Sequence, residues 1–321
     1  MKNMQLVIPC LFLPKDITAG LQLPALRTCL ARARAEPLSV VTLEQWLCEE
    51  FGVAGDGVAP VTLLADGVAP ESAYWLRADP VHLHLLHDRV ILRPDVTLTP
   101  DEARQLITAL NAHFDADGLR FSAPHPQHWY LRLDAAPDIT TQWLSEVDGA
   151  DVRPCLPQGA DALRWHRYLN EAQMLLHAHP LNVAREERGA LAVNSVWLWG
   201  GGTAGVLRKP DVTLCGDSEL ARAFATAAGV KAMTLEQGMA QAGDVLYISG
   251  DLQRTARRGD LIAWRADVEM LERICIAPLL KLLQAGKLEQ LTLDVPQAGA
   301  ARRFVLRKSD LWKVWRKGVA L

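Results

Sequence analysis

Short apolar runs alternate with amphipathic stretches of helical period in the C-terminal half of this chain. This alternation is typical of an α/β fold, with a doubly wound, mostly parallel sheet between two layers of helices. The predicted strands are Ser195–Trp199, Val212–Cys215, Val245–Ser249, Leu291–Val295 and Phe304–Arg307, and the predicted helices are Ser218–Ala228, Thr234–Ala242 and Ala266–Ala285.

The N-terminal part begins with a predicted buried strand at Gln5–Leu13 and a helix at Leu21–Arg34. A second helix is expected over Thr42–Phe51, because Thr42 is a favoured N-cap residue before a helical pattern. Two copies of DGVAP flank Val61–Ala65, which we predict to be a short strand between two loops.

Residues 94–165 interrupt the strand and helix alternation. Proline and acidic residues at Thr99-Pro100-Asp101-Glu102 predict a helix start, and the helix is expected to reach Phe114. Strands are predicted at Leu119–Ser122 and Trp129–Leu133, and a long helix at Ala160–His177. We therefore expect a smaller α+β domain at 94–165, inserted into a discontinuous α/β core made of 1–93 and 166–321.

Composition narrows the class of protein. The chain has 321 residues, half of them hydrophobic, and a net charge of −3, which gives no general attraction to nucleic acid or to an anionic membrane. No apolar run is long enough for a membrane span. The six cysteines lack the spacing of a zinc site, so we expect reduced, mostly buried thiols in a cytoplasmic protein.

The stretch HAHPLNVAREERGALAVNSVWLWGGG contains the strongest candidate site, a polar, Arg-bearing helix that leads into a strand and three glycines. Sites in α/β proteins are built at such strand ends. The alternative is that these residues only cap a helix and pack a strand. No P-loop or GxSxG motif is present. The candidate ligand-binding residues here are His179, Asn182, Arg185, Asn194, Trp199, Gly200 and Gly201.

Two further groups have candidate chemistry. His82, His84, His87 and Asp88 offer ligands for zinc or manganese, although they have no obvious partners elsewhere in the sequence. The C-terminal region is basic and contains aromatic residues, a pattern that also occurs in nucleic-acid-binding tails, but we expect Trp312 and Trp315, three residues apart, to form a docking face with the charges solvated outside. Its residues are Arg302, Arg303, Phe304, Arg307, Lys308, Trp312, Lys313, Trp315, Arg316 and Lys317.

The HAHPLN…R…N…WLWGGG sequence resembles the archaeal-type cofactor-independent phosphoglycerate mutases of the alkaline phosphatase superfamily. Weaker likeness extends to LTPDEARQLITALN, LSEVDGADV and GDVLYISGDLQRTARRGDLIAWRADVEMLE. WYLRLD and LPQGADALRWHRYLNEAQMLLHAHPLN resemble a proteobacterial branch described as Rpf-type regulatory or phosphoglycerate-mutase-like proteins. The resemblance implies an alkaline-phosphatase-like core and, in the family, two metal ions that assist phosphoryl transfer.

The residues that this chemistry needs are replaced in this chain. Where the resemblance implies an Asp-Gly metal site after the first strand, LVIPCLFLP has no acid before Asp16. The implied Asp-Glu-x-x-His falls on Gln253, Arg254 and Arg257, and cations there repel a divalent metal. No Ser or Thr nucleophile follows Arg77, and the late Asp-His pair has only Asp294.

The sequence thus predicts a non-catalytic relative without metal or other cofactor, which binds a small phosphorylated or anionic ligand or a protein partner and has a regulatory role. Arg254 and Arg257 join the predicted ligand-binding set, because guanidinium forks match phosphate geometry. Nucleic acid and membranes are not expected partners. The alternative is a phosphoglycerate mutase-like phosphomutase or phosphatase that binds manganese or zinc through relocated ligands, namely the histidine cluster and His179.

Overall fold

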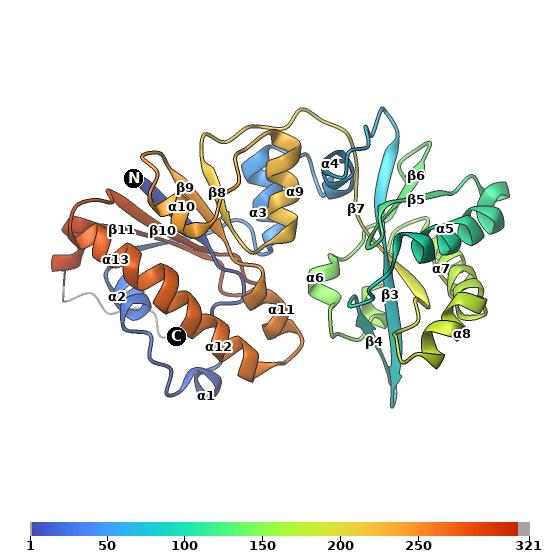
Figure 1. Cartoon of the computed structure of the whole chain (residues 1–321), viewed down its shortest axis with the longest axis horizontal. Coiled ribbons are helices and arrows are strands. Elements are labelled where there is room, and N and C mark those ends of the chain that lie inside the picture. Colours follow the sequence, from blue (N-terminus) through green and yellow to red (C-terminus); the bar gives the residue numbers. More distant parts are fainter. Residues whose placement is uncertain (1, 314–321) are drawn as a thin grey trace. The chain divides into compact units, whose positions relative to one another are not determined.

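The computed structural model describes residues 2–313, and the chain forms two compact units. The first unit comprises residues 1–52 and 207–321, and the second comprises residues 53–206 (Figure 1). Among the described residues, no helix has both the length and the apolar character that crossing a membrane requires.

The first unit is built on a mixed sheet in which four neighbouring strands are parallel. The strand β1 (Asn3–Val7) lies between β10 (Gln290–Val295) and β9 (Val245–Ile248), and β8 (Thr213–Gly216) follows β9. The other side of β10 carries β11 (Arg302–Arg307) and then β2 (Arg34–Pro37), both in antiparallel pairing.

Helices cover both faces of this sheet, as a doubly wound fold requires (Figure 1). One face is covered by α2 (Pro24–Arg32) and by a long helical segment made of α12 (Leu261–Leu271), a π turn (Glu272–Ile276) and α13 (Ala277–Gln284). The other face is covered by α3 (Leu43–Phe51) and α9 (Glu219–Ala228), whose Phe51 and Phe224 rings lie edge to face. The predicted α/β class is confirmed. Short helices complete the unit: α1 (Lys15–Thr18), α10 (Leu235–Met239), α11 (Asp251–Arg257) and the 3-10 turn Lys308–Trp312.

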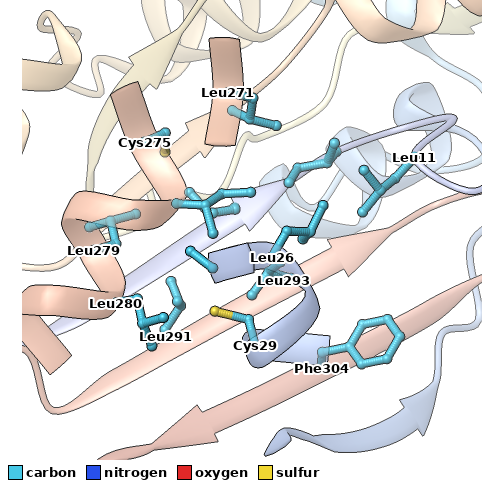
Figure 2. Close-up of a cluster of buried hydrophobic side chains, with 14 of the residues drawn as sticks. Leu11, Leu26, Cys29, Leu271, Cys275, Leu279, Leu280, Leu291, Leu293 and Phe304 are labelled. Carbon is cyan, nitrogen blue, oxygen red and sulfur yellow. The ribbon is translucent and has the colours of Figure 1, made fainter. Parts of the chain in front are cut away.

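The core on the α2 side explains why alternate residues of the strands are apolar. Figure 2 shows Leu291 and Leu293 of β10 facing Leu26 and Cys29 of α2, with Leu279 of α13 packed beside them. All of these side chains are buried, and burial of apolar area is the main favourable term in folding. The six cysteines are free thiols, four of them buried.

The second unit contains a five-stranded antiparallel sheet. Its central strand, β3 (Tyr74–Leu86), pairs with β6 (His128–Leu133) and β7 (Ser195–Thr203), and its distal half forms a hairpin with β4 (Arg89–Arg93). The strand β5 (Arg120–His125) pairs with β6. Helices α5 (Pro100–Phe114) and α7 (Ala162–His177) supply most of the helical residues in its apolar core. The remaining helices are α4 (Val58–Ala65), α6 (Leu144–Val147), α8 (Pro180–Glu187) and the 3-10 turns Asp115–Asp117 and Arg153–Cys155.

Three sequence expectations differ from this architecture. The second unit is wider than the expected insertion at 94–165, because β3 and β7 pair with each other and β3 pairs with β6. The predicted strand Ser195–Trp199 is part of β7, so it belongs to this antiparallel sheet and not to the parallel one. The segment Val61–Ala65 is helical rather than extended; it is part of α4, in which six residues are buried, and Pro60 lies in its first turn.

Candidate functional site

The carboxyl ends of the parallel strands in the first unit form the edge where α/β folds bind ligands. We call this the carboxyl edge and define it by the segments that directly follow β1, β8 and β9. These segments are Ile8–Cys10, Asp217–Ser218 and Ser249–Asp251. A Gly-Asp pair lies at the end of two of these strands: Gly216, the last residue of β8, precedes Asp217, and Gly250-Asp251 comes one residue after β9.

The segment after β1 makes a tight turn at Cys10, whose φ of 56° lies in the left-handed region that favours glycine. The Cys10 carbonyl oxygen accepts a 3.1 Å hydrogen bond from the indole N–H of Trp264, a fully buried residue of α12. This contact holds the turn in place. The turn itself, Pro9-Cys10, has no carboxylate to offer a ligand or a metal.

The segments after β8 and β9 are pressed together. A Cβ on Gly250 would lie 3.1 Å from Cα of Ser218, so a larger residue would force the two segments apart. Across this contact the Gly250 amide donates a 2.5 Å hydrogen bond to Oδ1 of Asp217. Burial raises the pKa of the Asp217 carboxyl, and the bond from Gly250 offsets part of that rise. The Asp217 carboxylate therefore binds the N-cap residue of α11, Gly250.

Helix α11 places an exposed cation at this edge. Arg254 Nη2 donates a 2.5 Å hydrogen bond to Oδ1 of Asp251, one turn earlier, and the Arg254 side chain is 55% exposed. Gln253 is buried beside it. The hydroxyl of Thr255 donates to Oδ2 of Asp267 on α12 at 3.2 Å, and burial raises the pKa of that carboxyl. The carboxyl edge therefore combines an exposed guanidinium group with carboxylates that are already hydrogen bonded.

Asp294, the acid that the resemblance places in the late Asp-His pair, lies fully buried within the sheet. Its carboxylate accepts two 2.6 Å hydrogen bonds from Arg303 on β11. It also accepts 2.8 Å bonds from the side-chain amide of Gln5 and the indole N–H of Trp46. Four donor groups thus bond to the Asp294 carboxylate. Through them Asp294 of β10 is linked to β1, β11 and helix α3.

The predicted ligand-binding residues of the HAHPLN stretch lie in the second unit, where they bond to the chain itself. His179 is the N-cap of α8 and accepts a hydrogen bond from the Leu181 amide. The buried Asn182 side chain bridges the carbonyl oxygens of Leu176 and Val193 and accepts from the Val193 amide. These contacts join the start of α8 to the end of α7 and to the segment before β7.

The next predicted residues also have partners within the chain. Asn194 bonds to both the amide and the carbonyl oxygen of Leu83, so its side chain extends the pairing between β7 and β3. Gly200 and Gly201 lie in a β-bulge of β7 opposite Leu76, and Gly200 has a φ of 65°. A Cβ on Gly201 would lie 2.3 Å from the Tyr74 hydroxyl. The glycines therefore allow close packing.

A buried polar network that the sequence did not predict joins β3, β6 and β7. Arg77 and Asp79 form a buried ion pair, with 2.6 Å between Nη2 and Oδ1. Trp199, a predicted ligand-binding residue, donates its indole N–H to Asp79 at 2.7 Å. Arg77 Nη1 donates to the Tyr130 hydroxyl, which in turn donates to Asp66 at 2.6 Å. Burial raises the pKa of Tyr130, so the phenol stays protonated and keeps this donor role.

The histidine cluster does not converge on one point. The rings of His82 and His84 stack along β3 with centroids 6.3 Å apart, and His82 Nδ1 is 2.9 Å from the Ala192 carbonyl oxygen. His87 lies in the turn to β4 with a φ of 54°, and Asp88 follows it. Across residues 2–313, no group of three or more His, Cys, Asp or Glu side chains is arranged to hold a metal ion.

The basic C-terminal region contributes mainly structural contacts as far as Lys313. Phe304 is buried in the core, and Arg303 is paired with Asp294. Arg307 donates to Gln290, and Lys313 pairs with Asp310. The predicted docking of Trp312 is wrong, because its side chain is 78% exposed. Trp315, Arg316 and Lys317 lie outside the described residues.

Part of the chain is similar in sequence to phosphoglycerate mutases. Over 107 residues it is 31% identical to a probable 2,3-bisphosphoglycerate-independent phosphoglycerate mutase of Geobacter sulfurreducens, covering 32% of this chain and 26% of that protein. Over 112 residues it is 29% identical to the 2,3-bisphosphoglycerate-independent phosphoglycerate mutase of Methanosarcina mazei, covering 33% and 28%. The match thus spans about a quarter of the length of these curated relatives. No family model matches the chain.

Two solved structures resemble the whole fold. The cofactor-independent phosphoglycerate mutase from Thermoplasma acidophilum matches with a TM-score of 0.50 and 14% identity, covering 100% of this chain and 94% of that one. The PH0037 protein from Pyrococcus horikoshii matches with a TM-score of 0.50 and 13% identity, covering 99% and 91%. The chain therefore shares the α/β fold of these two proteins.

Proposed function

We propose that this chain binds a small phosphorylated acid at the carboxyl edge of the first unit and does not transfer its phosphoryl group with metal ions. The observation that carries the proposal is Arg254, an exposed guanidinium in α11, the helix that follows the parallel strand β9. Ligands of open α/β sheets bind at this edge, and the guanidinium fork matches the geometry of a phosphate.

The ion pair between Arg254 and Asp251 is compatible with this role. Both side chains are largely solvent-accessible, and such surface pairs contribute about 0 to 1 kcal/mol, so a phosphate can displace the carboxylate at little cost. The resemblance places Gln253, Arg254 and Arg257 where the family has metal-binding residues. A cation in that place provides positive charge to an anionic ligand in the absence of a metal.

The relatives' names supply the ligand class. The proteins of Geobacter sulfurreducens and Methanosarcina mazei are described as phosphoglycerate mutases, so 3-phosphoglycerate is the first ligand to test. A phosphoglycerate carries both a phosphate and a carboxylate, each a bidentate acceptor for arginine. Binding without turnover is what a regulatory protein needs in order to respond to the level of such a metabolite.

Isothermal titration calorimetry with 3-phosphoglycerate and with inorganic phosphate tests the proposal on the full chain. Arg254→Ala should weaken binding at least about tenfold, the loss expected for one charge-assisted contact. Arg104→Ala is the matched control, because Arg104 also pairs with an aspartate at i−3 on an exposed helix turn. Binding that Arg254→Ala leaves unchanged would contradict the assigned site.

The metal-free part of the proposal needs its own experiment. The protein is incubated with manganese and zinc, desalted and subjected to elemental analysis. We expect no stoichiometric retention of either metal. Retention of about two metal ions per chain would instead indicate the two-metal phosphoryl transfer of the alkaline phosphatase superfamily, with ligands other than those the resemblance implies.

A further inference from the structure

The segment that runs from β9 into α11 contains three buried polar side chains that make no side-chain hydrogen bond within residues 2–313. Tyr247, Ser249 and Gln253 are 7%, 3% and 7% exposed. The hydroxyl groups of Tyr247 and Ser249 and the side-chain amide of Gln253 have no donor or acceptor among the described residues. Buried polar side chains are nearly always hydrogen bonded, so each exception needs an explanation.

Other buried polar side chains of this chain are well bonded. Asn182 makes three side-chain hydrogen bonds, and the Asp294 carboxylate accepts four. In the second unit, Ser122 on β5 and Trp165 on α7 each have one unpaired buried atom, and they lie on separate elements. The three groups of the segment from β9 to α11, by contrast, lie together in sequence, at the edge where open α/β sheets bind their ligands.

Gln253 and Arg254 are neighbours near the start of α11. Side chains on a helix lean toward its N-terminus, and the bond from Arg254 to Asp251 follows this direction. The two side chains differ in depth, because Arg254 is 55% exposed whereas Gln253 is 7% exposed. The Gln253 amide therefore lies deeper than the Arg254 guanidinium, at the same end of the helix.

The chemistry of an amide restricts which ligand group can pair with it. Its NH2 group donates hydrogen bonds, and its carbonyl oxygen accepts them. An ionised phosphate or carboxylate offers acceptors, so it pairs with the NH2 group and leaves the carbonyl oxygen of Gln253 without a donor. A hydroxyl group both donates and accepts. Burial and the negative charge of Asp217 raise the pKa of Tyr247, so its phenol stays protonated and is also able to donate.

We propose that Gln253 is a specificity-determining residue of the carboxyl edge, and that its amide carbonyl oxygen binds a hydroxyl group of the phosphorylated acid held by Arg254. This inference rests on the proposed function and narrows the ligand class to phosphorylated hydroxy acids, of which 3-phosphoglycerate, with its 2-hydroxyl, is one. A site that pairs a buried polar group with a ligand hydroxyl discriminates against an analogue without that hydroxyl, because the buried group is then left unpaired.

Calorimetry of the full chain with 3-phosphoglycerate and with 3-phosphonooxypropanoate, the same molecule without the 2-hydroxyl, tests the inference. The unmodified protein should bind 3-phosphoglycerate at least about tenfold more tightly than the analogue. Gln253→Met should abolish this preference, because a thioether is only a weak acceptor. The affinity for inorganic phosphate should stay the same within about twofold. Gln284→Met is the matched control, because Gln284 is an exposed glutamine at the end of α13.

Urea denaturation supplies a readout that is independent of the ligand. The Gln253 amide has no hydrogen bond to lose within the described residues, so Gln253→Met should not lower the urea midpoint. A lower midpoint would show that the amide stabilises the fold and would overturn the inference. Equal affinity of the unmodified protein for 3-phosphoglycerate and its analogue also overturns it, but leaves the proposed function in place if Arg254→Ala weakens the binding of both. Binding of neither ligand contradicts the inference and the proposed function together.

Discussion

The guanidinium group of Arg185 on α8 reaches the carboxylate of Glu102 on α5, where Nη1 donates a 2.8 Å hydrogen bond to Oε1. Both side chains are buried. Arg185 also donates to the carbonyl oxygens of Thr97 and Leu191, so its donors are directed to three separate segments of the second unit. The side chain thus joins two helices and the segments beside them.

Arg185→Ala should lower the free energy of unfolding by about 3 to 5 kcal/mol, because it leaves the buried Glu102 carboxylate without its buried partner. Urea denaturation followed by circular dichroism measures this loss. Arg188 also binds Glu102, but its side chain is 54% exposed, so Arg188→Ala should cost about 1 kcal/mol. A stable Arg185→Ala variant that has lost 3-phosphoglycerate binding would instead support the ligand-binding role predicted from the sequence.

Glu102 also predicts how stability depends on pH. Burial alone would raise its pKa above the usual 4.5, but the Thr99 amide and the guanidinium groups of Arg188 and Arg185 lower it to about 2. Because the folded-state pKa lies below the unfolded one, this stabilisation is complete above pH 4.5 and is lost as the pH falls toward 2.

The Glu102→Gln variant should therefore lose stability less steeply over that pH range than the unmodified protein does. Thermal unfolding at a series of pH values measures the slope. Asp101→Asn is a suitable control, because Asp101 is an exposed carboxylate in the same turn of α5. Equal slopes for Glu102→Gln and the unmodified protein would show that Glu102 does not contribute to acid unfolding.

Local signals predicted helix α5 well. Pro100 and the acidic residues Asp101 and Glu102 predicted the start of this helix, and the structure confirms this start and the end at Phe114. The structure adds a capping box between Thr99 and Glu102, which the sequence prediction did not include. These contacts lie within one helical turn. A short range of residues therefore contains all the information that fixes the start of this helix.

Strand partners could not be predicted in the same way. The run Ser195–Trp199 is apolar on both faces, and such a run reads alike in a parallel and in an antiparallel sheet. Its partner, β3, is more than a hundred residues earlier in the chain, so no local pattern links the two. This is why the sequence set the unit boundary at 94 and 165 and grouped β7 with the parallel strands.

The candidate site was predicted only in part. Arg254 was identified through the resemblance, whereas the Gly-Asp pairs at Gly216-Asp217 and Gly250-Asp251 were missed, although each directly follows a predicted strand. Their position directly after a predicted strand was the signal that could have identified these two pairs. The network of Arg77, Asp79 and Tyr130 had no such signal, because Arg77 and Asp79 lie on β3 and Tyr130 lies on β6, and only the tertiary fold brings these two strands together.

The glycines of β7 provide a test of close packing. A Cβ on Gly202 would lie 2.6 Å from Cα of Gly57, and neither backbone can move aside without disturbing the sheet or the start of α4. Gly202→Ala should therefore destabilise the protein by about 1 to 3 kcal/mol. Gly205→Ala is the control, because nothing lies within 4 Å of a Cβ at that position. Denaturation curves that coincide for the two variants would contradict the packing role.

Trp199 and Trp197 are neighbours on β7 whose indole groups donate to acceptors of different charge. Trp199 donates to the buried Asp79 carboxylate at 2.7 Å, whereas Trp197 donates to the Gln142 carbonyl oxygen at 3.0 Å. Removing a donor from a buried carboxylate costs about 1.5 to 3 kcal/mol, and removing one from a neutral acceptor costs about 0.5 to 1.5 kcal/mol. Trp199→Phe should therefore lower the free energy of unfolding more than Trp197→Phe does.

Both changes remove an indole, so the difference between the two variants reports the charge of the acceptor together with the contact between the Trp199 ring and Arg77, whose guanidinium carbon lies 5.4 Å from the ring centroid. Urea denaturation of the two proteins measures it, and calorimetry with 3-phosphoglycerate separates structure from binding. If the role of Trp199 is structural, Trp199→Phe lowers the stability of the protein and leaves the affinity for 3-phosphoglycerate per folded molecule unchanged. The opposite result, full stability with lost affinity, would show that Trp199 binds the ligand. The ligand-binding site would then lie in the second unit and not in the first.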